Sequence, residues 1–128
     1  MTQPVGHQLV VTRTFTQGDF DTFARLSGDD NPIHVDPEFA ARTRFGRTLA
    51  HGMMLFSTIS GLIRGAYDAE LEDIELMFPG PTYVGDAMTL QLTVVSRDGA
   101  RAEIAAHIHG PDGTPACVAT ARIISRDT

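Results

Sequence analysis

Lysine is absent from this 128-residue chain, and cysteine occurs only once, as Cys117. A single cysteine excludes a disulfide within the chain and argues against a cysteine-based metal site. All ten basic residues are arginine, which we attribute to coding bias, and the net charge is −6. This acidic balance argues against general nucleic-acid binding, which needs a basic face to replace the counterions around phosphate.

Long apolar runs are missing as well. The N-terminal stretch MTQPVGHQLVV has no charged region followed by a long apolar run, so we do not expect it to be a signal peptide. No stretch reaches the ~18 continuous apolar residues that a membrane helix needs. The length suits one hydrophobic core and no more. We therefore expect a soluble, cytoplasmic protein in which residues 1–128 form one domain.

The first part of the chain predicts a strand followed by a helix. Residues 7–16 are rich in β-branched side chains and roughly alternate in polarity, which is typical of a strand. Thr16, with Asp19 three residues later, predicts a helix start of the capping-box type. Gly28 ends this helix. Residues 36–50 indicate a short helical turn and then a surface segment.

The second part predicts one long helix and four strands. Residues 51–67, HGMMLFSTISGLIRGAY, are apolar on nearly every side, which predicts a helix buried on every side. The turn sequences RDGA and GPDGT separate four expected strands, at 71–84, 87–99, 101–110 and 115–126. This order predicts an α+β fold, a curved antiparallel sheet wrapped around the long helix. The open sheet edges predict pairing with a second copy of the chain.

The stretch GDDNPIH, residues 28–34, carries the clearest chemical signal. Pro32 restricts the backbone between Asp29 and His34, and Asn31 can lock the turn through its own backbone. A carboxylate beside an imidazole can hold one water from two sides and activate it for addition to an electron-poor carbon. Taken alone, the stretch favours a polar turn after a helix, because Asx-Pro turns are common at that place.

Gly52 provides a second signal, because it lies in the first turn of the long helix. A helix N-terminus has unpaired N–H groups, and glycine lets a substrate atom approach the backbone. The Gly52 N–H is therefore a candidate donor to the developing oxyanion of a thioester carbonyl. The alternative is a glycine required for close packing of the helix on the sheet. We expect the preceding residue, His51, to be neutral and structural, since a helix N-terminus disfavours positive charge.

Other candidate substrate-binding residues lie on the same helix and just before it. Phe56, Ser60 and Ile63 share the helix face of Gly52, and they could line an acyl tunnel or simply belong to the core. Arg44 and Arg47, in the segment RTRFGR, could meet the phosphates of coenzyme A or an acidic carrier protein. A solvated loop is the alternative for these arginines.

The two signals together resemble a known family. FARLSGDDNPIHVDPEFAA, followed about ten residues later by AHGM, resembles the MaoC-like (R)-specific enoyl-CoA hydratases. The family signature reads small-Gly-Asp-x-Asn-Pro-aliphatic-His, then five residues and a small one. Every element is present here, with Ala40 at the last position. The order of elements also fits along essentially the whole chain.

This resemblance implies a hot-dog fold, a homodimer, and reversible hydration of a trans-2-enoyl thioester to the (R)-3-hydroxyacyl thioester. It assigns the catalytic dyad to Asp29 and His34, and the oxyanion donor to Gly52. It implies neither a metal nor a redox cofactor, with coenzyme A being part of the substrate.

Three other functions stay open. The first is the reverse reaction, an (R)-3-hydroxyacyl thioester dehydratase working on coenzyme A or acyl-carrier-protein substrates in fatty-acid or related synthesis. The second is a hot-dog thioesterase, which usually has a carboxylate on the central helix, whereas residues 51–66 have none. The third is a non-catalytic acyl-binding subunit, although such subunits typically lose the Asp or the His.

Overall fold

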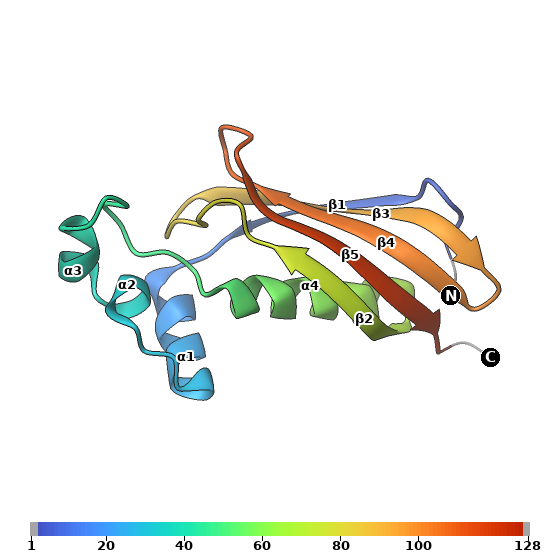
Figure 1. Ribbon diagram of the computed structural model, residues 1–128, viewed down its shortest axis with the longest axis horizontal. Coiled ribbons are helices and arrows are strands. Elements are labelled where there is room, and N and C mark those ends of the chain that lie inside the picture. Colours follow the sequence, from blue (N-terminus) through green and yellow to red (C-terminus); the bar gives the residue numbers. More distant parts are fainter. Residues whose placement is uncertain (1–2, 127–128) are drawn as a thin grey trace.

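The predicted fold class is confirmed by a computed structural model, which describes residues 3–126. A five-stranded antiparallel sheet, in the order β1-β3-β4-β5-β2, arches over the long helix α4 (Figure 1). The elements are β1 (Gln8–Thr14), α1 (Gln17–Ser27), α2 (Pro32–Val35), α3 (Pro37–Ala41), α4 (Gly52–Tyr67), β2 (Ala69–Met77), β3 (Ala87–Asp98), β4 (Arg101–His109) and β5 (Pro115–Ser125). None of these helices combines the length and apolar character needed to cross a bilayer.

The core lies between α4 and the concave face of the sheet. Strand β3 alternates buried and partly exposed residues, so Leu90 and Leu92 point inward from alternate positions. Ile59 and Ile63 of α4 belong to the same buried cluster and are fully inaccessible. Burial of each such side chain contributes roughly 1.5–3 kcal/mol, so this contact fixes the helix on the sheet.

The expectation that α4 is buried on every side is wrong for the single chain. The sheet covers one side of the helix, while Met53, Ser57, Gly61 and Arg64 on the other side are exposed. Met53 retains 54% of its accessible surface, a large value for an apolar residue in a helix of this composition. Small residues recur along this exposed face, but the many apolar residues around them in the sequence obscured that pattern.

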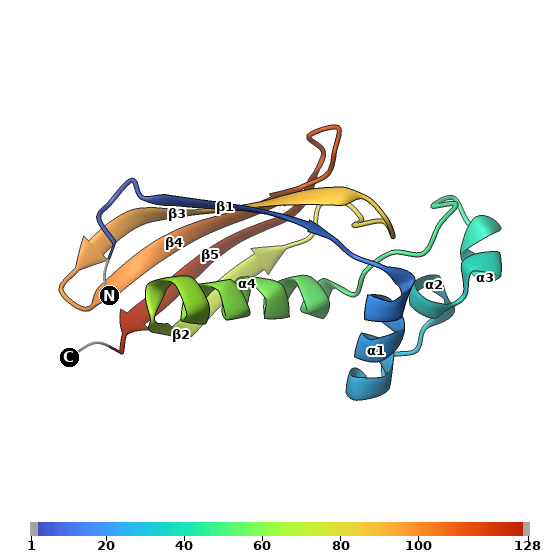
Figure 2. The ribbon, with the colours of Figure 1, turned by 180° about the vertical axis from the view of Figure 1, so that it is seen from behind.

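Helices α1, α2 and α3 gather beyond the N-terminus of α4, at one end of the molecule (Figures 1 and 2). The start of α1 is as predicted, because Thr16 and Asp19 form a capping box. Its end is also as predicted, since Gly28 adopts φ 81°, a left-handed conformation that favours glycine. The capped helix therefore delivers the GDDNPIH stretch to the N-terminal end of α4.

The strand expected at 71–84 is too long, because β2 ends at Met77. Pro79 and Pro81 follow, and neither has an N–H to donate to a neighbouring strand. The chain then pairs with the segment before α4, where the Ala50 N–H donates to the Thr82 carbonyl at 2.8 Å. This pairing places the loop after β2 against the start of α4.

Candidate active site

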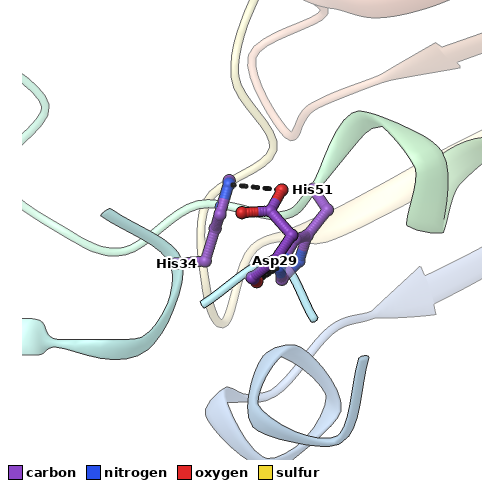
Figure 3. A group of neighbouring side chains, drawn as sticks. All are labelled: Asp29, His34 and His51. Atoms are coloured by element: carbon purple, nitrogen blue, oxygen red, sulfur yellow. Dashed lines mark hydrogen bonds and ion pairs between the residues drawn. The ribbon is translucent and has the colours of Figure 1, made fainter. Parts of the chain in front are cut away.

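Asp29 is positioned by hydrogen bonds with two neighbouring residues, Ser27 and Asn31. Its N–H donates to Ser27 Oγ at 3.1 Å, and its Oδ1 accepts from the Asn31 N–H at 3.4 Å. The other carboxylate oxygen, Oδ2, faces His34 (Figure 3). The Asp29 side chain is 56% exposed, so solvent reaches it. One oxygen thus positions the carboxylate and the other is directed at the imidazole.

His34 is carried by α2, a four-residue helix at a place where the sequence indicated only a turn. Pro32 is at its first position, and the Asn31 side chain caps it by accepting from the Ile33 N–H at 3.1 Å. Gln17, which sequence reasoning missed, braces this helix: its amide donates to the His34 carbonyl at 2.9 Å. Gln17 in turn accepts a hydrogen bond from Thr48 at 2.6 Å.

The hydrogen bond of His34 fixes which ring nitrogen is free. Its Nδ1 lies 2.7 Å from the Leu49 carbonyl, which can only accept, so Nδ1 carries the proton. In the neutral ring, Nε2 is then an acceptor. It lies 4.0 Å from Asp29 Oδ2, too far for a direct hydrogen bond. Two acceptors at this separation suit one water molecule, which can donate one hydrogen to each.

Gly52 is the first residue of α4, and no acceptor within residues 3–126 bonds to its N–H. A Cβ at this position would lie 3.0 Å from the Phe78 ring, so only glycine allows the aromatic ring to pack so close. Gly52 thus combines an N–H unpaired among the described residues with a close neighbour, but that neighbour is the Phe78 ring in the loop after β2 and not the sheet. Gly52 lines the same cavity as His34.

That cavity has a volume of about 430 Å³ and lies between α2, the start of α4 and the loop after β2. Its walls are mostly apolar, with one imidazole and one guanidinium. The lining residues are His34, Arg44, Phe45, Leu49, Ala50, Gly52, Leu55, Phe78, Pro79, Gly80, Pro81 and Thr82. A concave, largely apolar site with a few polar groups is typical of a small-molecule pocket.

Among the predicted site residues, His34, Gly52 and Arg44 line this cavity together. Asp29 is not one of the lining residues, but its Oδ2 lies 4.0 Å from His34 Nε2. Arg47 lies elsewhere: its guanidinium bonds Asp86 at 3.0 and 3.3 Å, and it stacks on Tyr83. The two terminal guanidinium nitrogens of Arg47, which would have donated to a phosphate, therefore donate to Asp86.

The remaining predicted substrate-binding residues do not line this cavity either. Asn31 uses its side chain to cap α2, and Ile63 is fully buried in the core, which is the alternative that the sequence left open. Phe56 and Ser60 are partly buried on α4. The cavity instead meets α4 at Gly52 and Leu55, so an acyl tunnel along Phe56, Ser60 and Ile63 is not seen in the single chain.

Ligand atoms of Asp29, His34 and His51 lie within 4.8 Å of one another, a spacing compatible with a metal site. The imidazole planes argue against one. The two rings are stacked with centroids 3.9 Å apart and planes inclined by 22°, so their in-plane lone pairs do not converge on one point. Each ring also has one nitrogen bonded to a backbone carbonyl. This geometry therefore does not favour a metal shared by the three residues.

Cys117 is no candidate nucleophile. Its side chain is fully buried in the core, and burial raises the pKa of its thiol to about 11. The thiolate, which is the reactive form, is therefore scarce at neutral pH.

Comparison with known proteins agrees with this geometry. Residues 2–109 match the family model described as "MaoC like domain". An (R)-specific enoyl-CoA hydratase of Aeromonas caviae is 36% identical over 100 residues, which are 78% of this chain and 68% of that protein. A mitochondrial 3-hydroxyacyl-[acyl-carrier-protein] dehydratase of Arabidopsis thaliana is 37% identical over 83 residues, 64% of this chain and 50% of that one.

The solved structure of an (R)-hydratase from A. caviae involved in PHA biosynthesis superposes with a TM-score of 0.91. It is 31% identical and covers 96% of this chain and 97% of its own. The chain belongs to the MaoC-like family. The hydro-lyase class and the hot-dog fold predicted from the sequence are thereby confirmed.

Proposed function

We propose that this chain hydrates a trans-2-enoyl thioester reversibly to the (R)-3-hydroxyacyl thioester. The observation that carries the proposal is the 4.0 Å gap between His34 Nε2 and Asp29 Oδ2, two acceptors beside a cavity that also contains Gly52. The (R) configuration follows the hydratase relatives, whose names specify it.

The reaction follows from these positions. A water held by Asp29 and His34 adds its oxygen to C3 of the enoyl group while one of its protons passes to the dyad. Charge builds on the thioester oxygen, where the Gly52 N–H stabilises it. The dyad then returns a proton to C2, and the C2–C3 double bond becomes single. Addition of water is redox-neutral, so we propose that no resident redox cofactor takes part.

Incubation of the purified chain with crotonyl-CoA tests this function. We expect loss of the conjugated enoyl absorbance and formation of (R)-3-hydroxybutyryl-CoA, with no free thiol released. Release of coenzyme A without hydration would identify a thioesterase instead. Comparing kcat/KM for the same acyl group on coenzyme A and on acyl carrier protein shows which carrier the chain prefers, and preference for the carrier protein would favour a dehydratase of a synthetic pathway.

Arg44 is the proposed contact for the phosphate groups of the carrier. It lines the cavity, is exposed, and its guanidinium lies over the Phe45 ring at 4.3 Å. We expect Arg44→Ala to raise KM for crotonyl-CoA a few-fold with kcat unchanged, the size of a solvent-exposed ion pair. Arg47→Ala is the matched control, since Arg47 is bound to Asp86 away from the cavity. Equal KM values in wild type and Arg44→Ala would remove this assignment.

A homodimer is part of the proposal, and β2 is the proposed contact. This strand is an edge of the sheet, and exposed Met77 and Phe78 lie at its end, beside the cavity. Two β2 carboxylates are already paired within the chain, Glu72 with Arg101 at 3.0 Å and Asp73 with Arg122 at 2.7 Å. This pairing reduces the repulsion between two acidic edges.

Sedimentation tests the dimer. We expect twice the mass of the chain, and we expect Met77→Asp to weaken association about tenfold or more, because it would bury a charge in the contact. Val10→Asp is the control, an exposed apolar residue on the opposite edge strand, β1. A monomer in wild type, or equal effects of the two variants, would contradict the assignment.

A further inference from the structure

His51 lies directly behind the dyad and is almost completely buried, with 2% of its surface exposed. Its ring contacts two others, Phe23 at a centroid distance of 4.8 Å and His34 at 3.9 Å. Figure 3 shows His51 beside Asp29 and His34. The contact with His34 is a stack with the planes inclined by 22°. Although His51 is the N-cap residue of α4, its side chain makes no capping hydrogen bond. The ring therefore has another use.

That use is a hydrogen bond to the other half of the dyad. His51 Nε2 lies 2.8 Å from the backbone carbonyl of Asp29, which can only accept, so Nε2 carries the proton. In the neutral ring, Nδ1 is then left unprotonated. Within residues 3–126 this buried Nδ1 has no hydrogen-bond partner, a costly arrangement that a purely space-filling residue would not need.

We propose that His51 is a positioning residue for hydration, which sets the separation between the Asp29 carboxylate and His34. One imidazole touches both members: its Nε2–H holds the backbone of Asp29, and its face supports the ring of His34. Asp29 itself is largely exposed and sits in a loop, where its Oδ1 accepts from the Asn31 N–H and its own N–H donates to Ser27 Oγ. The hydrogen bond from His51 connects this loop backbone to the start of α4. The inference rests on the proposed hydratase function.

Three substitutions separate the two contacts. His51→Phe keeps a flat ring against His34 but loses the donor. His51→Gln keeps an amide donor toward Asp29 but loses the aromatic stack, and His51→Ala loses both. We expect kcat for crotonyl-CoA to fall about a hundredfold in His51→Ala, the cost of roughly 1 Å of misplacement, and to recover in part in the other two. KM should stay close to the wild-type value, because His51 does not line the cavity.

A comparison in the Asp29→Asn background distinguishes positioning from general destabilisation. If His51 acts by placing Asp29, His51→Ala should cost little further activity once that carboxylate is gone. His7→Ala is the control, another histidine whose buried Nδ1 has no partner among the described residues, in ring contact with Tyr67 at the other end of α4. We expect this variant to keep the wild-type kcat.

The outcomes are distinct. Inactivity of the wild-type chain on enoyl thioesters would overturn the proposed function itself. An active wild type with an unchanged kcat in folded His51→Ala would overturn the positioning role alone. So would an equal loss from His51→Ala with and without the Asp29 carboxylate, or a rise in KM in place of a fall in kcat. Thermal unfolding of each variant gives its folded fraction, and kcat is calculated per folded molecule.

Discussion

We expect Asp29→Asn and His34→Ala each to lower kcat for crotonyl-CoA by about 10²–10⁴-fold, the usual contribution of a positioned acid or base. Asparagine has nearly the same shape as aspartate but presents an N–H₂ group where the water needs an acceptor. Alanine at 34 removes the Nε2 acceptor 4.0 Å from the carboxylate. Neither side chain belongs to the hydrophobic core, so we expect both variants to stay folded.

The double variant sharpens this prediction. Because the two groups hold one water together, Asp29→Asn with His34→Ala should lose no more activity than the worse single variant. Steady-state kinetics on protein checked by circular dichroism measures both effects. Near-full activity in the two single variants, or losses that multiply, would show that the residues do not act as a unit.

The second large effect concerns the backbone N–H of Gly52. Proline is the one standard residue without this N–H, and the first position of a helix tolerates proline. The preceding residue, His51, has φ −63° and ψ 137°, the extended conformation that a residue before proline requires. Since a Cβ at position 52 would meet Phe78 at 3.0 Å, the substitution is made in a Phe78→Ala background.

The informative pair is therefore Gly52→Ala/Phe78→Ala against Gly52→Pro/Phe78→Ala. Both variants add a Cβ, but only the second loses the N–H. We expect a kcat lower by about 10²–10³ in the proline variant, as for other oxyanion donors. Equal kcat values in this pair, with equal thermal stability, would refute the role of Gly52.

Much of the frame of this site was predictable because its signals are local. The capping box at Thr16, the left-handed Gly28 and the N-terminal position of Gly52 each depend on a few neighbouring residues. The short helix α2 was missed because only four residues form it, starting directly at Pro32. Asn-Pro indicates a turn as readily as a capped helix start. Four residues are also too few to show the apolar periodicity of a helix.

The misplaced residues depend on contacts between distant parts of the chain. Arg47 forms an ion pair with Asp86, 39 residues away, and no local sequence pattern predicts that pair. The three-and-four spacing predicts that Phe56, Ser60 and Ile63 share one helix face. It does not predict how much of that face the sheet covers. The structural role expected for His51 fits its buried ring and its hydrogen bond to the Asp29 carbonyl, whereas its contact with both members of the dyad required the tertiary fold.

Hydration of crotonyl-CoA in D₂O provides the most direct test of the central claim, that one water held by Asp29 and His34 supplies the hydroxyl at C3 and that the same pair protonates C2. His34 lines the cavity and Asp29 Oδ2 lies 4.0 Å from its Nε2, so the water and the returning proton come from one pair of groups. The oxygen and the deuterium should therefore arrive on the same face of the double bond. We predict a single diastereomer of (R)-3-hydroxybutyryl-CoA with syn addition, measured by proton coupling constants. Addition to opposite faces, or an equal mixture of diastereomers, would contradict this mechanism.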